Sequence, residues 1–428
     1  MKVLLLGGGG REHALAWKLL QSPKLGRLYA MPGCWALKGM TELVEGDPAD
    51  PQAVLNACRG NAIDLVVVGP EAPLAAGVAD TVRAAGFKVF GPGREAARLE
   101  SSKSFAKAFM KRHGIPTAEH ETYDDASTAR DAAAELELPL VVKADGLAAG
   151  KGVRVCRTRQ EAVEAVQDFM LKEALGAAAK TVVIERFLEG REATLMVLCD
   201  GKTFIPLSAS QDHKRVGDGD SGPNTGGMGA IAPVPWLSPE DMSLAHEEIL
   251  FPTLKGLKAD GIDFRGTLYF GLMFTADGPR LLEYNVRFGD PETQAVLPLL
   301  KNDLLAGLAA AAAGDLGAWE PVWRPGYSVC VVLASEGYPG TPKTGRRITG
   351  LESVADIDPT ISVFHSGTHR AAEDWMTAGG RVLGVTAVSK TVQSARDKAY
   401  EAVSKLHFNG VHYRKDIGGA TALSERIK

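Results

Sequence analysis

The segment that reads as a β-strand near residues 280–285 carries a polar triplet, Glu283, Asn285 and Arg287. Residues two apart on an extended strand project to the same face. We therefore expect the Glu283 carboxylate and the Asn285 carbonyl to lie side by side as ligands for Mg²⁺, which proteins hold with a few oxygens plus substrate phosphates. Arg287 could grip a carboxylate or phosphate through its planar guanidinium. The alternative is a polar face on a half-solvated strand, because short motifs often occur by chance.

A glycine-rich turn at residues 7–10 follows the apolar strand Lys2 to Leu6 and precedes a helix from about Arg11 to Leu20. Backbone N–H groups at the start of such a helix can face a phosphate. A dinucleotide-binding turn would need an acidic residue about twenty positions later, and residues 28–33 contain none. This argues against a nicotinamide site and leaves either a phosphate site or a turn that only closes the βα unit.

Alternating strands and helices continue to about residue 100, with further strands at 63–68 and 88–90 and an amphipathic helix running through Ala84. This rhythm predicts a parallel, doubly wound sheet, whose ligands gather outside the carboxyl ends of the strands. The segments at those ends are Gly7 to Arg11, Pro32-Gly33 and Gly69 to Glu71.

A loop dense in glycine and alanine, residues 144–152, separates the strand Leu140 to Lys143 from the strand Val153 to Cys156. It is not a Walker loop, because neither the glycine spacing nor the Lys-Ser/Thr ending is present. We expect a hairpin able to fold over phosphates; the alternative is an ordinary hairpin tip with an incidental lysine.

The stretch from residue 210 to 229 is the least regular of the chain and opens with Asp212, His213 and Lys214. Long polar loops inside compact domains are usually functional or disordered. The charged opening suits anionic ligands, whereas His213 alone could equally be a surface histidine.

The composition fits a multidomain protein of ordinary globular character: 428 residues, 45% hydrophobic and 23% charged, with a formal net charge of -4. Without a basic excess we expect no nucleic-acid partner. The apolar run at the N-terminus is too short for a membrane span, and the five scattered cysteines contain no Cys-x-x-Cys pair. We expect a cytoplasmic protein without a disulfide framework or a zinc site.

Several longer motifs then indicate a family. The chain resembles the phosphoribosylamine–glycine ligases, ATP-grasp enzymes of purine synthesis, over its whole length. The segments that carry the resemblance are GGREHALAWKL, VVGPEAPLAAG, KADGLAAGKGV, SQDHKRVGDGDSGPNTGGMGA and RFGDPETQ. It implies a doubly wound N-terminal domain at residues 1–100, an ATP-grasp domain at 101–325 with a mobile lid at about 120–188, and an α+β domain at 326–428.

The resemblance also implies roles by position. Two lysines, Lys103 and Lys143, would contact the phosphates of ATP. The adenine would lie against Glu185 and the backbone of Phe187 and Leu188, with Glu192 on the ribose. The loop with Gly146, Gly150, Lys151 and Gly152 would form the phosphate lid, and Glu283 and Asn285 would hold Mg²⁺ or Mn²⁺.

The implied reaction joins glycine to 5-phosphoribosylamine. Glycine would attack the γ-phosphate of ATP to give glycyl phosphate, and the amine would then displace phosphate. Arg287, Asp212 and Lys214 are the candidate catalytic residues, and water exclusion by the lid would protect the acyl phosphate. The candidate substrate-binding residues are Gly9, Gly10, Arg11, Pro32, Gly33, Glu71, His213, Arg287, Gly289 and Asp290. We expect a monomer with small-molecule substrates and no membrane partner.

The chain departs from the family pattern at three places. The first turn has four glycines instead of Gly-x-Gly-Gly, Cys34 and Trp35 follow Pro32-Gly33 where relatives have asparagine, and Gly271 stands where many ATP-grasp enzymes carry a second acidic metal ligand. Two alternatives stay open: another ATP-grasp ligase, such as a carboxylase subunit, and a catalytically silent ATP-binding regulator.

Overall fold

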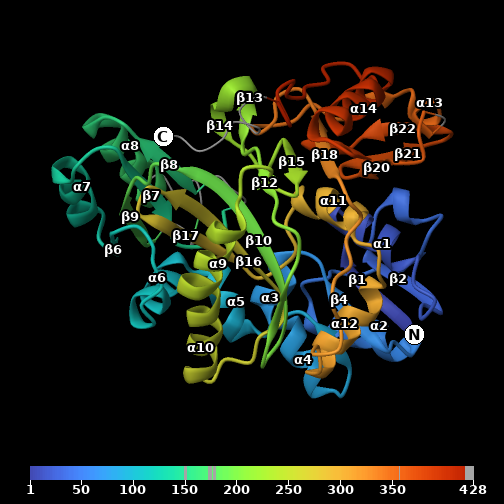
Figure 1. Cartoon of the computed structure of the whole chain (residues 1–428), viewed down its shortest axis with the longest axis horizontal. Helices are drawn as coiled ribbons and strands as arrows, with labels where there is room; N and C mark the ends of the chain where they lie inside the picture. The colour runs from blue at the N-terminus through green and yellow to red at the C-terminus, as the bar shows by residue number, and fades with distance from the viewer. Residues whose placement is uncertain (149–151, 172–175, 177–179, 356, 420–428) are drawn as a thin grey trace.

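The computed structural model describes residues 1–148, 152–171, 176, 180–355 and 357–419. It contains an N-terminal domain, a central ATP-grasp-like body with a lid, and a C-terminal domain (Figure 1). The central strands lie between the lid on one side and the two terminal domains on the other. Among the described helices, none is both long and apolar enough to cross a membrane.

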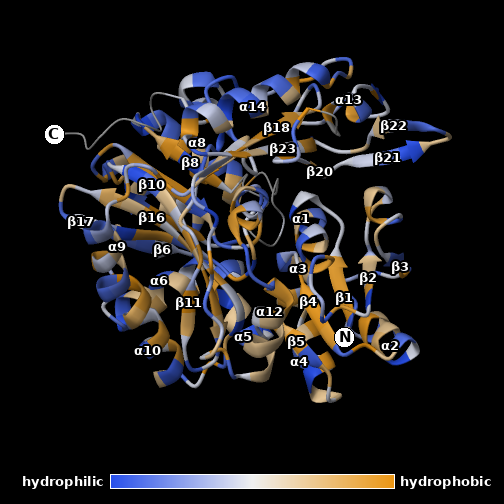
Figure 2. Cartoon of the chain, turned by 45° about the vertical axis from the view of Figure 1, so that its right-hand side comes forward, coloured by the Kyte–Doolittle hydropathy of each residue, from blue (hydrophilic) through white to orange (hydrophobic). Residues whose placement is uncertain are grey.

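The N-terminal domain is built on a parallel sheet with strand order β3-β2-β1-β4-β5. Alternate residues of β1 pack into different clusters, Leu4 and Leu6 on one face and Val3 and Leu5 on the other. Both faces are therefore covered, which confirms the doubly wound sheet and explains its continuous apolar strands (Figure 2). Its elements are β1 (Lys2–Gly7), α1 (Gly10–Leu19), β2 (Arg27–Pro32), η1 (Trp35–Leu37), β3 (Glu42–Leu43), α2 (Pro51–Asn61), β4 (Leu65–Val68), α3 (Glu71–Ala76), α4 (Val78–Ala84), β5 (Lys88–Phe90) and α5 (Arg94–Ser101).

The single helix predicted to run through Ala84 is two helices, α3 and α4. Gly77 between them has a φ of +82°, a left-handed conformation that ends α3. Glycine reaches this conformation without the steric cost that a Cβ would bring. The break places Glu71 on a short helix of its own at the carboxyl end of β4.

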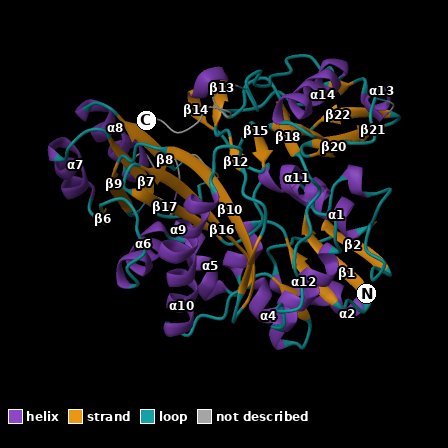
Figure 3. Ribbon diagram, viewed as in Figure 1, coloured by secondary structure: helices purple, strands orange, loops and turns teal. Residues whose placement is uncertain are grey.

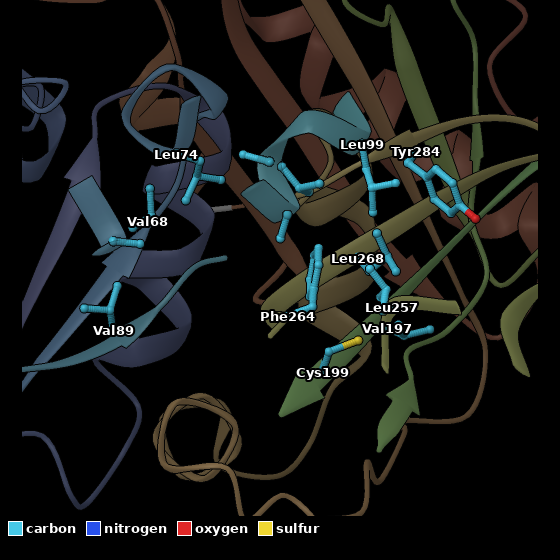
Figure 4. Packing of buried hydrophobic residues seen from close by; sticks show 14 of the residues in the cluster. Val68, Leu74, Val89, Leu99, Val197, Cys199, Leu257, Phe264, Leu268 and Tyr284 are labelled. Carbon is cyan, nitrogen blue, oxygen red and sulfur yellow. The ribbon is translucent and has the colours of Figure 1, made fainter. Parts of the chain in front are cut away.

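The central body is an antiparallel sheet with strand order β11-β10-β16-β17. Figure 4 shows Val197, Leu268 and Tyr284 of this sheet packing with Leu257 and Phe264 in a buried cluster. A capping box at Ser238 starts the helical run that covers it. The elements are α6 (Lys103–Arg112), β10 (Arg191–Asp200), β11 (Phe204–Pro206), α9 (Pro239–Ala245), the π-helical η4 (His246–Leu250), α10 (Phe251–Ala259), β16 (Arg265–Thr275) and β17 (Gly278–Asn285).

The lid is a separate small layer with strand order β6-β9-β7-β8, and it carries the helices α7 and α8. Its apolar side chains, including Val142, Phe169 and Ile184, form a cluster distinct from those of the other domains. The lid therefore has a core of its own. Its elements are β6 (His120–Tyr123), α7 (Ala126–Glu135), β7 (Leu140–Ala144), β8 (Val153–Cys156), α8 (Arg159–Met170) and β9 (Val182–Arg186).

The C-terminal domain contains a sheet of order β12-β15-β18-β23-β20, in which β12 is Gln211–Asp212 and β15 is Gly229–Ala232, and the smaller sheet β19-β22-β21 (Figure 3). Its elements are β18 (Tyr327–Ala334), β19 (Arg347–Ile348), α13 (Leu351–Ala355), β20 (Ile361–His365), β21 (Thr368–Ala371), β22 (Asp374–Thr377), β23 (Arg381–Ser389) and α14 (Val392–Lys405). Before it, α11 (Glu292–Val296), η5 (Leu297–Leu299) and α12 (Leu304–Ala313) connect the domains. Leu305 and Leu308 of α12 share a buried cluster with both β1 and β10.

The prediction that residues 210–229 are irregular is wrong. They form β12 (Gln211–Asp212), β13 (Arg215–Gly217), η3 (Asp218–Asp220) and β14 (Ser221–Asn224), followed by β15 (Gly229–Ala232). β15 pairs with β18, about a hundred residues later in the chain. The regular structure here therefore depends on a long-range partner strand. Residues of the central body thus complete the sheet of the C-terminal domain.

Candidate active site

A cavity of about 1280 Å³ opens where the N-terminal domain, the central sheet, the lid and the C-terminal domain meet. Most of the side chains predicted from the sequence converge on it. Those that line it are Arg11, Glu71, Lys103, Lys143, Gly152, Glu185, Phe187, Leu188, Glu192, Asp212, His213, Lys214, Glu283, Asn285, Arg287 and Asp290.

The remaining predicted residues fall into two groups. In the described part of the chain, Gly9, Gly10, Pro32, Gly33, Gly146 and Gly289 do not line the cavity. Gly150 and Lys151 lie outside the described residues.

Glu283 and Asn285 both face the cavity from β17, as their spacing predicts. A register shift opposite Gly271 and Leu272 leaves Leu282 as an extra residue in β17. Such a bulge interrupts the regular alternation of side chains between the two faces of the strand. Leu281 and Tyr284, on either side of the bulge, are buried, while Glu283 lines the cavity. Gly271 pairs directly with Glu283, so the strand opposite supplies no second acidic ligand.

Arg287 lies beyond the end of β17 and is held by carboxylates. Its Nε lies 3.2 Å from Glu71 Oε2 and its Nη2 lies 3.0 Å from Glu100 Oε1. Nη2 also donates to Asn285 Oδ1 over 3.1 Å. Burial alone would lower the pKa of Arg287, but the two glutamates outweigh it and raise that pKa. Arg287 thus links the N-terminal domain to the metal-ligand candidate Asn285.

The lysines predicted for phosphate binding lie near each other at the lid side of the cavity. Lys103, at the first position of α6, donates to the Gly146 carbonyl over 3.2 Å, and burial lowers its pKa. Ser102 caps the N-terminus of helix α6, where its hydroxyl accepts a hydrogen bond from the Phe105 N–H. Lys143, on β7, forms an ion pair with Glu185 on the neighbouring strand β9.

Lys214 connects two other candidates. Its Nζ lies 3.0 Å from Glu192 Oε2 and 3.9 Å from Glu283 Oε1. One lysine therefore spans the predicted ribose carboxylate and the predicted metal carboxylate.

The pKa values of Asp212 and His213 are shifted in opposite directions. Burial, followed by the charge of Glu292, raises the pKa of Asp212 well above its usual value. Burial lowers the pKa of His213 to about 4, so this histidine is neutral at physiological pH. Asp212 Oδ1 has no hydrogen-bond partner among the described residues. His213 is buried, so the alternative of a surface histidine is wrong.

The glycine turn and the Pro32–Gly33 segment lie together at the carboxyl ends of β1 and β2. A Cβ at Gly8 would lie 2.2 Å from the Gly33 carbonyl oxygen, so only glycine permits this approach. Arg11 extends from the turn to the cavity, with its Nε on Glu12 at 2.5 Å and its Nη1 on the Phe288 carbonyl at 3.1 Å.

Sequence reasoning missed several polar residues of the cavity, among them Lys107, Glu100, Tyr338 and Arg381. Lys107 follows Lys103 by one helical turn, a spacing that could have revealed it. No sequence spacing links Arg381 and Tyr338 to the cavity, because they come from the C-terminal domain, far along the chain from the predicted site residues. Arg381 binds the carbonyls of Gly226 and Asp290 at 2.5 and 2.7 Å, and Tyr338 accepts from the Gly226 N–H at 2.9 Å.

Known families match this architecture along nearly the whole chain. Models of phosphoribosylglycinamide synthetase match with their N domain at residues 1–100, their ATP-grasp (A) domain at 101–293 and their C domain at 328–420. The chain belongs to the phosphoribosylglycinamide synthetase family. The resemblance seen in the sequence is thereby confirmed.

Individual members of the family are similar over their full length. A phosphoribosylamine–glycine ligase of Rhizobium meliloti is 48% identical over 98% of each chain, and that of Vibrio cholerae is 45% identical over 100% of each. The crystal structure of the ligase from Thermotoga maritima superposes with a TM-score of 0.85 at 36% identity, covering 97% of this chain and all of the other.

More distant structures share only the fold. The biotin carboxylase domain of 2-oxoglutarate carboxylase from Hydrogenobacter thermophilus has a TM-score of 0.75 at 18% identity, covering 96% of this chain and 91% of the other. This agrees with an ATP-grasp architecture in the phosphoribosylglycinamide synthetase family and carries no inference about substrates.

Proposed function

We propose that this chain joins glycine to 5-phosphoribosylamine with cleavage of ATP, giving glycinamide ribonucleotide, ADP and phosphate, the second step of de novo purine biosynthesis. Membership of the phosphoribosylglycinamide synthetase family and the activity named for its full-length relatives support this. The observation that carries it is one cavity with lysines at the lid side and Arg11 of the glycine turn on the N-terminal domain. Such a cavity suits a triphosphate and a phosphorylated sugar in the same space.

ATP would lie between the lid and the central sheet. Lys103 and Lys143 would contact its phosphates, with the loop of Gly146, Gly150, Lys151 and Gly152 above them. Glu185 and the hinge backbone would hold the adenine, and Glu192 the ribose. The Phe187 N–H already donates to the Pro139 carbonyl over 3.2 Å, so the Leu188 N–H is the better donor for the adenine edge.

The side chains at the end of β17 fit Mg²⁺ or Mn²⁺. Glu283 and Asn285 offer one charged and one neutral oxygen, the donors that hard cations prefer. No group of three or more histidine, cysteine, aspartate or glutamate side chains suited to a metal occurs in the described residues. The substrate phosphates would then complete the ligand set, and the ion would supply charge neutralisation on the phosphoryl oxygens.

The chemistry must bring two anions together and then remove a proton. The ammonium groups of Lys103 and Lys143 would offset repulsion between the glycine carboxylate and the γ-phosphate. After glycyl phosphate forms, the attacking amine loses a proton. A carboxyl whose pKa is raised is suited to accept it at neutral pH, which favours Asp212 as general base.

Arg287 and Asp290, which line the cavity, would form the floor of the substrate region, with Gly289 between them in the chain. Arg11, Glu71 and His213 would border it, with Gly9, Gly10, Pro32 and Gly33 behind them at the strand ends. We further propose a cytoplasmic monomer whose domains divide at residues 1–100, 101–325 and 326–428. Light scattering of the purified protein tests the monomer.

Substrate-dependent phosphate release tests the function. With Mg²⁺-ATP present, release should require glycine and 5-phosphoribosylamine together, and glycinamide ribonucleotide should accumulate in equal amount. Release that depends instead on bicarbonate or another acceptor would favour a different ATP-grasp ligase. Tight ATP binding without turnover on any acceptor would favour the silent regulator.

A further inference from the structure

The carboxylate of Glu185 lies between two buried lysines. Lys107 Nζ is 2.6 Å from Glu185 Oε2, and Lys143 Nζ contacts Glu185 Oε1. The side chains of Lys107 and Glu185 are each only 3% exposed, and that of Lys143 is 8% exposed. The group therefore holds two positive charges against one negative charge where water has little access.

The two lysines are anchored differently. Lys107 donates to the Thr117 hydroxyl over 2.7 Å, and that hydroxyl donates to the Leu281 carbonyl over 2.6 Å. Besides Glu185, the one hydrogen-bond acceptor of Lys143 among the described residues is the Leu282 carbonyl, at a long distance of 3.5 Å. Lys107 is thus fixed by a chain of short hydrogen bonds to β17, whereas Lys143 is the member of the pair that is easily displaced.

An anion that enters the cavity changes the ion pairs of the Glu185 carboxylate. If phosphates of ATP attract the Lys143 ammonium, the Glu185 carboxylate loses one of its partners. A buried carboxylate without a cation is costly, and removing one partner of a buried pair typically has a large effect. With Lys107 in place, Glu185 keeps a charged partner in both situations.

We propose that Lys107 is a positioning residue for ATP: it retains the Glu185 carboxylate, so that the Lys143 ammonium can pass from Glu185 to the phosphates. This rests on the proposed function, in which Lys143 contacts the phosphates. Lys107 itself need not touch the nucleotide.

The protonation states agree with this arrangement. Burial lowers the pKa of Lys107 to about 8, against the opposing charge of Glu185, so the lysine remains mostly protonated at neutral pH. For Glu185, burial raises the pKa, but Lys143 and Lys107 outweigh it and the net pKa is lowered. The Glu185 carboxylate is therefore ionised when it forms ion pairs with both ammonium groups.

A double-mutant cycle tests whether Lys107 acts through Glu185. The affinity of a non-hydrolysable ATP analogue is measured by calorimetry, with Mg²⁺, for the wild type, Lys107→Met, Glu185→Gln and the double variant. In Lys107→Met, Lys143 becomes the sole cation on Glu185 and is held there. We expect affinity to fall by about 10- to 100-fold, the range for losing a hydrogen bond to a charged group.

In the Glu185→Gln background the same Lys107→Met change should have little effect, because the carboxylate that Lys107 retains is gone. An equal loss in both backgrounds would overturn the proposal, since Lys107 would then act on the nucleotide directly. Failure of the wild type to bind the analogue would instead contradict the proposed function, so the two failures are distinguishable.

Two further variants separate positioning from a general loss of structure. Lys107→Arg keeps the charge and should recover most of the affinity, with the KM for glycine unchanged throughout. Lys111→Met, at an exposed position on the same helix, is the matched control and should bind the analogue like the wild type. If Lys107→Met does not fold, the affinity of Thr117→Val is measured instead, because this change removes the hydroxyl that anchors Lys107. A loss of affinity smaller than that expected for Lys107→Met supports the proposal, and wild-type affinity overturns it.

Discussion

Glu283 presents a half-buried side chain to the cavity. Its carboxylate lies 3.9 Å from Lys214 Nζ, and burial, which raises its pKa, is outweighed by Lys214, Lys143 and Lys103, which lower it. It is thus an ionised oxygen donor surrounded by cations. That environment suits a group that shares its charge with a metal and a nucleotide.

We expect Glu283→Ala to lower Mg²⁺-dependent turnover by ~10²–10³-fold, the usual loss when one group that stabilises developing charge is removed. Phosphate release is measured across a Mg²⁺ titration, with circular dichroism to check that the fold is intact. Glu283→Gln keeps the shape and loses the charge, so it should be similarly impaired. Near-normal turnover in either variant would contradict the assignment of Glu283 as a metal ligand.

Asp212 permits a prediction about pH. Its pKa is raised first by burial and then by the charge of Glu292. A general base must be deprotonated, so activity should be lost as pH falls through that pKa. Glu292→Gln removes the neighbouring charge and should move the acid limb of the kcat profile to lower pH. An unmoved limb would mean that Asp212 is not the group that titrates.

At the scale of elements, the β13–β14 hairpin depends on a segment near the C-terminus. The Arg414 side chain is 1% exposed and lies 2.6 Å from both Asp220 and Asp416. It also donates to the Arg215 carbonyl over 3.2 Å. The Lys415 N–H adds a 2.7 Å hydrogen bond to Asp218. The hairpin follows directly on Asp212–Lys214, so this contact supports one wall of the cavity.

Arg414→Met should cost roughly 3 kcal/mol of unfolding free energy, at the low end for a broken buried pair because Asp220 is largely exposed. Urea unfolding measures the loss, and hydrogen exchange should rise in residues 215–224. Arg347→Met is the matched control: its ion pair with Asp374 is exposed and is worth at most about 1 kcal/mol. Equal losses in both variants would show that Arg414 does not hold the hairpin.

On the scale of the whole molecule, the N-terminal and C-terminal domains meet through histidines. His13 of α1 lies with its ring centroid 5.5 Å from His365 and 6.0 Å from Phe364 of β20. Burial lowers the pKa of His13 to about 3, with a smaller contribution from His365. Burial also lowers the pKa of His365 to about 4. Both rings are neutral in the folded protein.

This interface should weaken on acidification. The unfolded histidines bind protons below about pH 6.5 while the folded ones do not, so the stability is complete above pH 6.5 and is lost as pH falls towards 4. Each histidine contributes a slope of about 1.4 kcal/mol per pH unit in that window. The unfolding free energy of His13→Phe should therefore fall less between pH 7 and pH 5 than that of the wild type. If the unfolding free energy falls equally in both proteins, His13 does not contribute to the loss of stability at low pH.

Much of the local structure follows from short stretches of sequence. The strand at Lys2–Gly7, the cap at Ser102 and the turn at Asp277-Gly278 were predictable because hydrophobic period, side-chain capping and turn chemistry act within a few residues. The shared face of Glu283 and Asn285 was predictable for the same reason. The family motifs extended this to the domain order.

Other features depend on partners far along the chain. The bulge at Leu282, the two carboxylates on Arg287, the second lysine on Glu185 and the strands within residues 211–232 all depend on contacts between distant segments. Local propensity carries no information about which of many compatible neighbours a side chain will meet. By itself the sequence determined the elements and the groups that can do chemistry. Only the tertiary structure decided which charges share a site, because that follows from how the sheets pack around one cavity.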